Sequence, residues 1–80
     1  MTYRRADCAA IHQGKCLALN GSEIKFLSAE PIEEGLALEI KVWSKTGGVT
    51  KMTAFIEVIK SVPYASRLFQ INAAIKTIKG

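Results

Sequence analysis

Apolar and polar residues alternate with a period of two along most of this chain, and no stretch keeps the longer period of a helix. Glycine-containing pairs and prolines interrupt the alternation at short intervals. Such a pattern buries one face of each strand and leaves the other in water, as antiparallel strands do. The sequence therefore predicts an all-β fold, namely a small antiparallel barrel or strongly twisted sheet of five to six strands.

The spacing of the apolar residues sets the expected strands. They are Lys15–Leu19, Glu23–Leu27, Leu36–Trp43, Val49–Ile59 and Arg67–Lys76. In the third and fourth expected strands the even-numbered residues form the apolar face. In the last expected strand the odd-numbered residues form it. Turns are expected at Ser44–Gly48 and at Ser61–Ala65, where Pro63 should end the strand.

The Asn20-Gly21 pair between two alternating runs is a strong hairpin signal, because a type I′ turn needs positive φ at both central positions. A two-residue loop there pairs Leu19 with Ser22. Nearer the start, Asp7–Ile11 is ambiguous: we expect a first strand, although alanines also favour a helical turn there.

The chain has 80 residues, enough for one domain. We expect a basic N-terminal tail over residues 1–6 and a single barrel domain over residues 7–78. No apolar run reaches the ~20 residues of a membrane span, and no secretory signal is evident, so a cytoplasmic location without membrane insertion is expected. The net charge is +4, and the basic residues are distributed along the chain, with only Arg4 and Arg5 adjacent. Such a distribution does not indicate binding to a nucleic acid polymer.

The chain carries no recognisable enzyme motif, so we expect a non-enzymatic protein without a cofactor. Cys8, Cys16 and His12 supply at most three metal ligands, whereas structural zinc needs four. The two cysteines are interpreted as small buried thiols, and no metal site is expected.

The order of these elements resembles a PilZ domain over most of the chain, from about Tyr3 to Ile78. The resemblance rests on the basic start, the run Ala18-Leu19-Asn20-Gly21-Ser22-Glu23-Ile24-Lys25-Phe26, then Ser28, Pro31, Gly35 and the three later strands. It implies a six-stranded antiparallel barrel and a role in bacterial cyclic di-GMP signalling.

Members of that family that bind cyclic di-GMP usually carry an R-x-x-x-R pair ahead of the barrel, and this chain lacks one of the two arginines. The family's [D/N]-x-S-x-x-G motif is also incomplete. Keeping Asn20 and Ser22 in place puts Lys25 on the glycine, whereas the gap-free match puts Ala18, Asn20 and Glu23 on the three motif positions. The resemblance therefore implies a degenerate nucleotide site, with Arg4, Arg5, Asn20 and Ser22 as its candidate ligand-binding residues.

Three functional interpretations remain open, the third of which assumes a barrel unrelated to the PilZ domain. The first is a binding module whose protein partner, or a second copy in a homodimer, contacts Trp43, Phe55 and Ile59 or an open sheet edge. The alternative is a working cyclic di-GMP sensor that uses Arg4, Arg5 and the Asn20–Ser22 hairpin. The third is an unrelated nucleic-acid-binding barrel of the OB type, for which Trp43 between Lys41 and Lys45, with Phe55 and Lys51 nearby, is a partial match.

Overall fold

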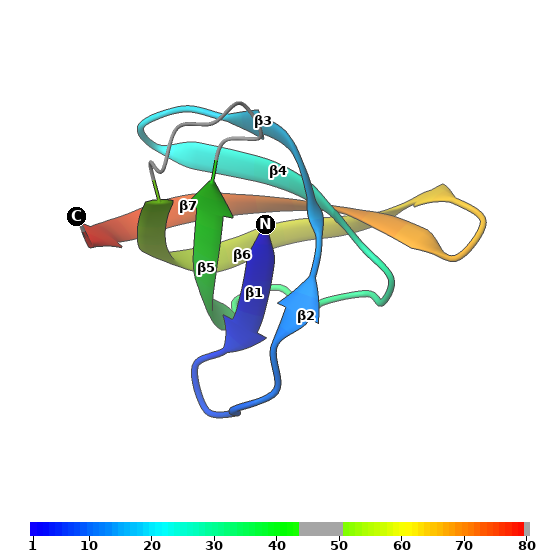
Figure 1. Ribbon diagram of the computed structural model, residues 1–80. Coiled ribbons are helices and arrows are strands. Elements are labelled where there is room, and N and C mark those ends of the chain that lie inside the picture. The colour runs from blue at the N-terminus through cyan, green and yellow to red at the C-terminus, as the bar shows by residue number, and fades with distance from the viewer. Residues whose placement is uncertain (44–50, 80) are drawn as a thin grey trace.

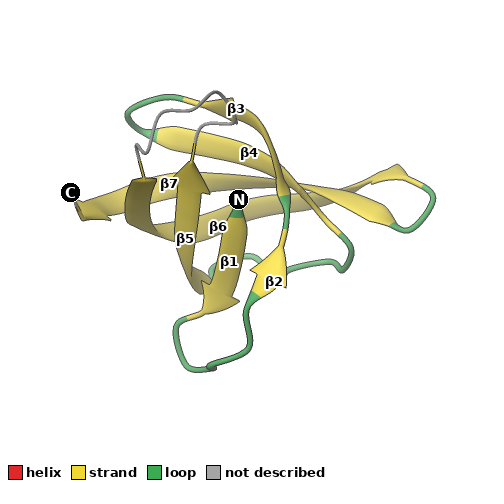
Figure 2. Cartoon of the chain, in the orientation of Figure 1, coloured by secondary structure: helices red, strands yellow, loops and turns green. Residues whose placement is uncertain are grey.

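The computed structural model describes residues 1–43 and 51–79, and these residues form strands and loops without a helix (Figure 2). The strands are β1 Thr2–Arg5, β2 His12–Gln13, β3 Lys15–Leu19, β4 Glu23–Ser28, β5 Ala37–Trp43, β6 Lys51–Ala65 and β7 Leu68–Lys79. All pairings are antiparallel, in the order β2-β1-β5-β6-β7-β4-β3. The all-β fold and the small antiparallel barrel predicted from the sequence are confirmed.

The sheet curls until its two edges meet in one segment of chain (Figure 1). β2 pairs with β1, and β3 pairs with β4, yet only Gly14 separates β2 from β3. The break at Gly14 makes seven strands where five to six were expected. Gly14 suits this corner because a Cβ there would lie 2.9 Å from the carbonyl oxygen of Leu27.

The core lies inside the curl and follows the predicted alternation. Its fully buried large side chains are Ile24, Phe26, Leu38, Ile40, Ile56, Val58 and Ile71. Ile32 closes one end, because the loop between β4 and β5 carries it into the core with 3% exposure. Gly35 ends that loop at a φ of 84°, a conformation that glycine adopts without strain.

The structure corrects the N-terminal predictions. Thr2–Arg5 are strand β1 between β2 and β5, and not part of a tail. The strand expected over Asp7–Ile11 is wrong, because this segment is an exposed loop between β1 and β2. The physical reason is Tyr3, whose buried ring holds β1 in the sheet, whereas Asp7–Ile11 contribute nothing to the core.

The hairpin at Asn20-Gly21 exists, but its register differs from the prediction. Leu19 pairs with Ile24, two residues further along, and a bulge lies between Cys16 and Ala18. The Asn20 side chain decides this turn: its Oδ1 accepts bonds from the backbone N–H groups of Ser22 and Glu23, at 2.8 and 2.9 Å. Neither Asn20 nor Gly21 has a positive φ, so the turn is an Asx-type loop rather than type I′.

Pro63 does not end β6, contrary to the prediction. β6 continues to Ala65, and the turn is formed by Ser66 and Arg67, the latter at a φ of 62°. β5 pairs with β6 as far as Glu57, and Val58 exchanges two further backbone bonds with Gly35 and Leu36. Pro63 lies well beyond them, where β6 pairs with β7 but not with β5, so a residue without an N–H is tolerated there. The other predicted turn, Ser44–Gly48, lies outside the described residues.

We expect Gly14→Ala to destabilise the barrel by about 1–3 kcal/mol, because the new methyl group would press on the backbone of β4. Gly21→Ala is the matched control: a Cβ there meets nothing within 4 Å, so its effect should stay within about 0.5 kcal/mol. Urea unfolding of both variants measures the difference. Equal stabilities would contradict a close approach at Gly14.

Candidate functional site

Arg4 and Arg5 lie at the end of β1, and Arg4 is already engaged. Its Nε donates to Oε1 of Glu39 across the strand pair at 3.0 Å, and its Nη1 donates to the carbonyl oxygen of Cys8 at 3.3 Å. The side chain of Arg5 is exposed. An incoming phosphate would therefore compete with the Glu39 carboxylate for Arg4.

Asn20 and Ser22 lie at the tip of the β3–β4 hairpin, where their side chains serve the turn. Ser22 Oγ donates to Asn20 Oδ1 at 3.1 Å, in addition to the two backbone donors on that oxygen. The Ser22 carbonyl oxygen accepts from the N–H of Ile75 at 2.8 Å, which attaches the tip to β7.

The four candidate nucleotide-binding residues are not brought together. β1 runs from the Thr2–Gln13 pair toward Arg5, whereas β2 and β3 run from the same pair toward Asn20 in the opposite direction. Ten residues of strand therefore separate Arg5 from Asn20, roughly 30 Å along the strands. The two groups lie at opposite ends of the molecule (Figure 1).

The three residues predicted to bind a partner are also spread out. Trp43 and Ile59 are 45% and 52% exposed, and Phe55 is half-buried. Trp43 pairs with Lys51 and therefore lies beside that position of β6. About four residues of β6 separate Lys51 from Phe55, and another four separate Phe55 from Ile59. Each step is roughly 13 Å, so the three side chains do not form one patch.

The barrel wall has an open seam beside Trp43 that the sequence does not reveal. β1 ends its pairing with β5 at the Thr2–Lys41 pair, while β5 continues to Trp43 and β3 continues to Leu19. We call the interval between β3 and the last two residues of β5 the open seam. No local pattern predicts it, because it follows from the pairing of strands that are distant in the sequence.

A cavity of about 450 Å³ occupies the base of the open seam. Its lining residues are Met1, Gly14, Lys15, Cys16, Val42 and Trp43. Among the described residues no carboxylate lines it, and Lys15 is the charged side chain at its edge. The cavity thus combines an apolar wall with a basic rim, a combination that suits a partly apolar, anionic ligand.

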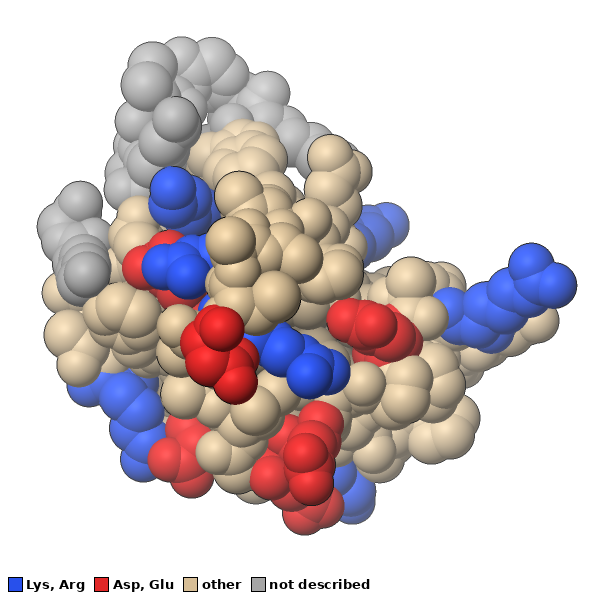
Figure 3. Space-filling view, turned by 90° about the horizontal axis from the view of Figure 1, so that it is seen from below, with Lys and Arg blue, Asp and Glu red and all other residues tan. Residues whose placement is uncertain are grey.

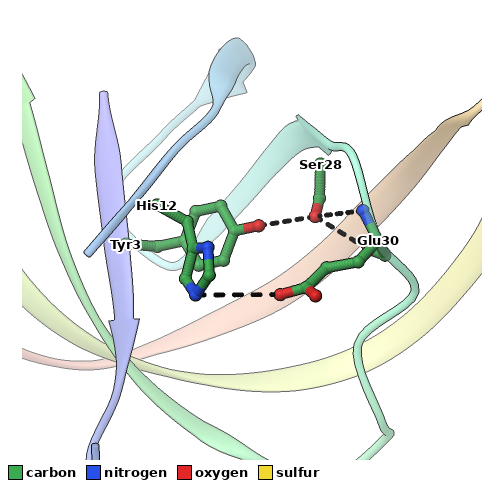
Figure 4. A network of polar contacts seen from close by, with 4 residues as sticks. All are labelled: Tyr3, His12, Ser28 and Glu30. Atoms are coloured by element: carbon green, nitrogen blue, oxygen red, sulfur yellow. Dashed lines mark hydrogen bonds and ion pairs between the residues drawn. The ribbon is translucent and has the colours of Figure 1, made fainter. Parts of the chain in front are cut away.

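A network of polar contacts between Tyr3, His12, Ser28 and Glu30 fastens β1 to the rest of the barrel (Figure 4). The Ser28 hydroxyl donates to the carbonyl oxygen of Glu30 at 2.7 Å, so the Tyr3 hydroxyl must donate to Ser28 Oγ, also at 2.7 Å. His12 stacks on Tyr3 with ring centroids 5.3 Å apart, and its Nε2 lies 3.9 Å from Glu30 Oε1. Each of these contacts satisfies or orders a residue of the barrel, so the network is structural.

Burial raises the pKa of the Tyr3 hydroxyl above its usual 10.0, because the phenolate would lose solvation inside the barrel. The hydrogen bond with Ser28 and the charge of Arg5 act in the opposite direction, and the Glu30 carboxylate adds to the increase. Tyr3 therefore stays neutral and keeps its hydrogen bond across the physiological range.

The cysteines occupy different surroundings. Cys8 is exposed in the loop after β1, which corrects the expectation of a buried thiol, and Cys16 is partly buried beside the core. Across residues 1–43 and 51–79, no three histidine, cysteine or acidic side chains gather as a metal site would require.

Charge is mixed on the face of the barrel shown in Figure 3. Basic and acidic side chains alternate over it rather than forming one basic field. Of the residues behind the OB-type interpretation, Lys45 lies outside the described residues. This face offers no electrostatic support for that interpretation.

Comparison with known proteins gives no match: no family model, no curated protein and no solved structure is similar to this chain. In the part of the chain that the structure describes, no helix has the length and apolar character needed to cross a bilayer.

Tyr3→Phe should lower the free energy of unfolding by about 1 kcal/mol at neutral pH, since Ser28 keeps its bond to Glu30 and no buried group is orphaned. The same variant should change the response to alkali. Between pH 10 and the raised native pKa, the unfolded chain releases a proton that the native state retains, so wild-type stability falls as the pH rises.

Urea unfolding at about pH 8 and about pH 11 measures this loss. Tyr3→Phe should show a smaller loss than the wild type, whereas Tyr64→Phe, which alters an exposed tyrosine, should match the wild type. An unchanged alkaline loss in Tyr3→Phe would show that other groups cause it.

Proposed function

We propose that this chain is a non-enzymatic, PilZ-like module of bacterial cyclic di-GMP signalling that acts mainly through protein–protein contacts and has a degenerate nucleotide site. The observation that carries the proposal is the separation of Arg4 and Arg5 from Asn20 and Ser22, at opposite ends of the barrel. Nucleotide sites depend on groups that converge on the ligand, and these four do not converge.

The engagement of Arg4 supports the same conclusion. Its guanidinium would have to leave Glu39 to bind a phosphate, and the abandoned carboxylate, only 14% exposed, would then repel that phosphate. To bind a ligand, Asn20 Oδ1 would likewise have to release the backbone N–H groups of Ser22 and Glu23, whose hydrogen bonds shape the turn. Ligand binding at either end would therefore work against contacts that hold the barrel together.

The open seam supports a protein partner. Leu17 and Leu19 on β3 are each 40% exposed, and Trp43, which lines the cavity from β5, is 45% exposed, so large apolar side chains are exposed on both strands that border the seam. Exposed apolar groups around a concave site are typical of interaction surfaces. Trp43 is well suited to be the main contact, because tryptophan dominates the binding energy of many interfaces.

Calorimetric titration with cyclic di-GMP tests the degenerate site. We expect no binding heat at ligand concentrations up to about 1 mM, which corresponds to an affinity weaker than about 4 kcal/mol. Micromolar binding that is lost in an Arg4→Ala, Arg5→Ala double variant would instead establish the sensor function.

Trp43→Ala tests the protein contact. Captured partners from a lysate of the source bacterium should be lost, while the free energy of unfolding drops by only about 1 kcal/mol because the indole is half-exposed. Tyr64→Ala, at the exposed β6–β7 hairpin, is the matched control and should retain the same partners. Identical captured proteins for both variants would remove Trp43 from the interface.

A further inference from the structure

β4 carries a buried leucine that does not belong to the core. Leu27 is 9% exposed, yet it lies outside the cluster of buried residues that fills the barrel. It follows the buried Phe26 along the strand, so its side chain points to the opposite, outer face of the sheet. Its neighbours in the register are Lys15 of β3 and Gln70 of β7. A leucine buried on the outer face indicates a second, smaller apolar site there.

A groove of about 310 Å³ lies beside this leucine. Its lining residues are Gln13, Gly14, Lys15, Leu27, Ala29 and Leu68. Leu68 is also on the outer face, because the next residue, Phe69, packs against the core. We call this cavity the outer groove. It shares Gly14 and Lys15 with the cavity of the open seam, but that cavity extends toward β5, whereas the outer groove extends toward β4 and β7.

Two lysines lie on the same outer face of the sheet. Lys25 of β4 and Lys60 of β6 both pair with Asn72 of β7. Asn72 points outward, because its neighbours Ile71 and Ala73 are buried. The two lysines are therefore two strand spacings apart, roughly 10 Å. Both are exposed, and neither forms an ion pair with a described residue.

Basic residues also lie directly at the outer groove. Lys15 lines it, and Lys25 is the outward residue of β4 that precedes Leu27. Arg67, which is exposed, immediately precedes Leu68 in the turn between β6 and β7. The groove thus combines an apolar floor with basic side chains around it.

Acidic residues are concentrated elsewhere in the molecule. All seven acidic residues of the chain occur at or before Glu57, so the part of the β6–β7 hairpin that projects beyond the barrel carries only basic charges (Figure 1). Among the described residues no carboxylate lines the outer groove. The Glu30 carboxylate lies 3.9 Å from His12 Nε2, and Glu23 and Glu57 pair with Ala74, beyond the two lysines. Charge complementarity therefore calls for an acidic ligand.

We propose that the outer groove binds a short segment of a partner protein in which one apolar residue of leucine size is flanked by acidic residues. The apolar side chain contacts Leu27 and Leu68, and the flanking carboxylates contact Lys15 and Lys25. The contact is made by side chains, because the groove lies on a face of the sheet and not at its edge. This surface is separate from Trp43, so the proposal goes beyond the proposed function and does not depend on it.

A blocked pentapeptide with a central leucine between two pairs of aspartates is the probe, and amide NMR signals of the whole chain report on its binding. We expect saturable shifts at Ala29 and Leu68 with a dissociation constant below about 1 mM. The matching peptide with lysines in place of the aspartates should not bind. A central glycine should weaken binding at least about tenfold, because the groove then stays unfilled.

Charge reversal and groove filling supply the variants. Lys25→Glu should weaken the aspartate peptide about fivefold and give the lysine peptide measurable affinity, a gain that requires a folded chain. Lys41→Glu is the matched control, because it changes an exposed lysine of β5 away from the groove, and it should alter neither affinity by more than about twofold. Ala29→Phe, at an exposed position, should fill the groove and weaken the aspartate peptide at least about tenfold.

Four peptide results would overturn the proposal: no saturable binding, equal binding of the aspartate and lysine peptides, undiminished binding of the glycine peptide, or equal effects of Lys25→Glu and Lys41→Glu. Shifts of the same signals on raising the protein concentration, with dimers in sedimentation, would assign the outer groove to a second copy and would also overturn it. Tighter binding of a short single-stranded oligonucleotide than of the aspartate peptide would do so as well. None of these outcomes bears on the Trp43→Ala test of the proposed function.

Discussion

The closure of the sheet at Gly14 is the constraint on which the rest of the structure depends. A seven-stranded sheet becomes a barrel because one segment, His12–Leu19, pairs with β1 at its start and with β4 at its end. The segment can turn from one partner to the other only where the chain passes within contact distance of the Leu27 backbone, and glycine alone leaves room for that passage.

The Tyr3 network secures the same junction with polar contacts. Its members come from β1, β2, β4 and the loop that follows β4. The network therefore joins the two edges of the sheet at the place where β1 is paired with β2. The buried Tyr3 ring and its hydroxyl bond hold a strand of only four residues against the core.

The open seam lies next to this junction. Cys16 and Val42 line its cavity beside Trp43. The candidate interaction surface therefore follows from tertiary packing rather than from a motif. This separates the surface from the candidate nucleotide residues, which lie at the two ends of the strands.

The sequence by itself determined the strands and their faces. Apolar residues at every second position of β5, β6 and β7 are buried or partly buried, as predicted, because a pleated strand must direct alternate side chains to opposite sides. It also predicted a hairpin at Asn20-Gly21. The tertiary structure decided what depends on neighbours in space: the Asx bonds that move the hairpin register, the passage of β6 through Pro63 where one side is unpaired, and the pairing of Arg4 with Glu39. The open seam belongs to this second group, because β3 and β5 border it only once the sheet has curled.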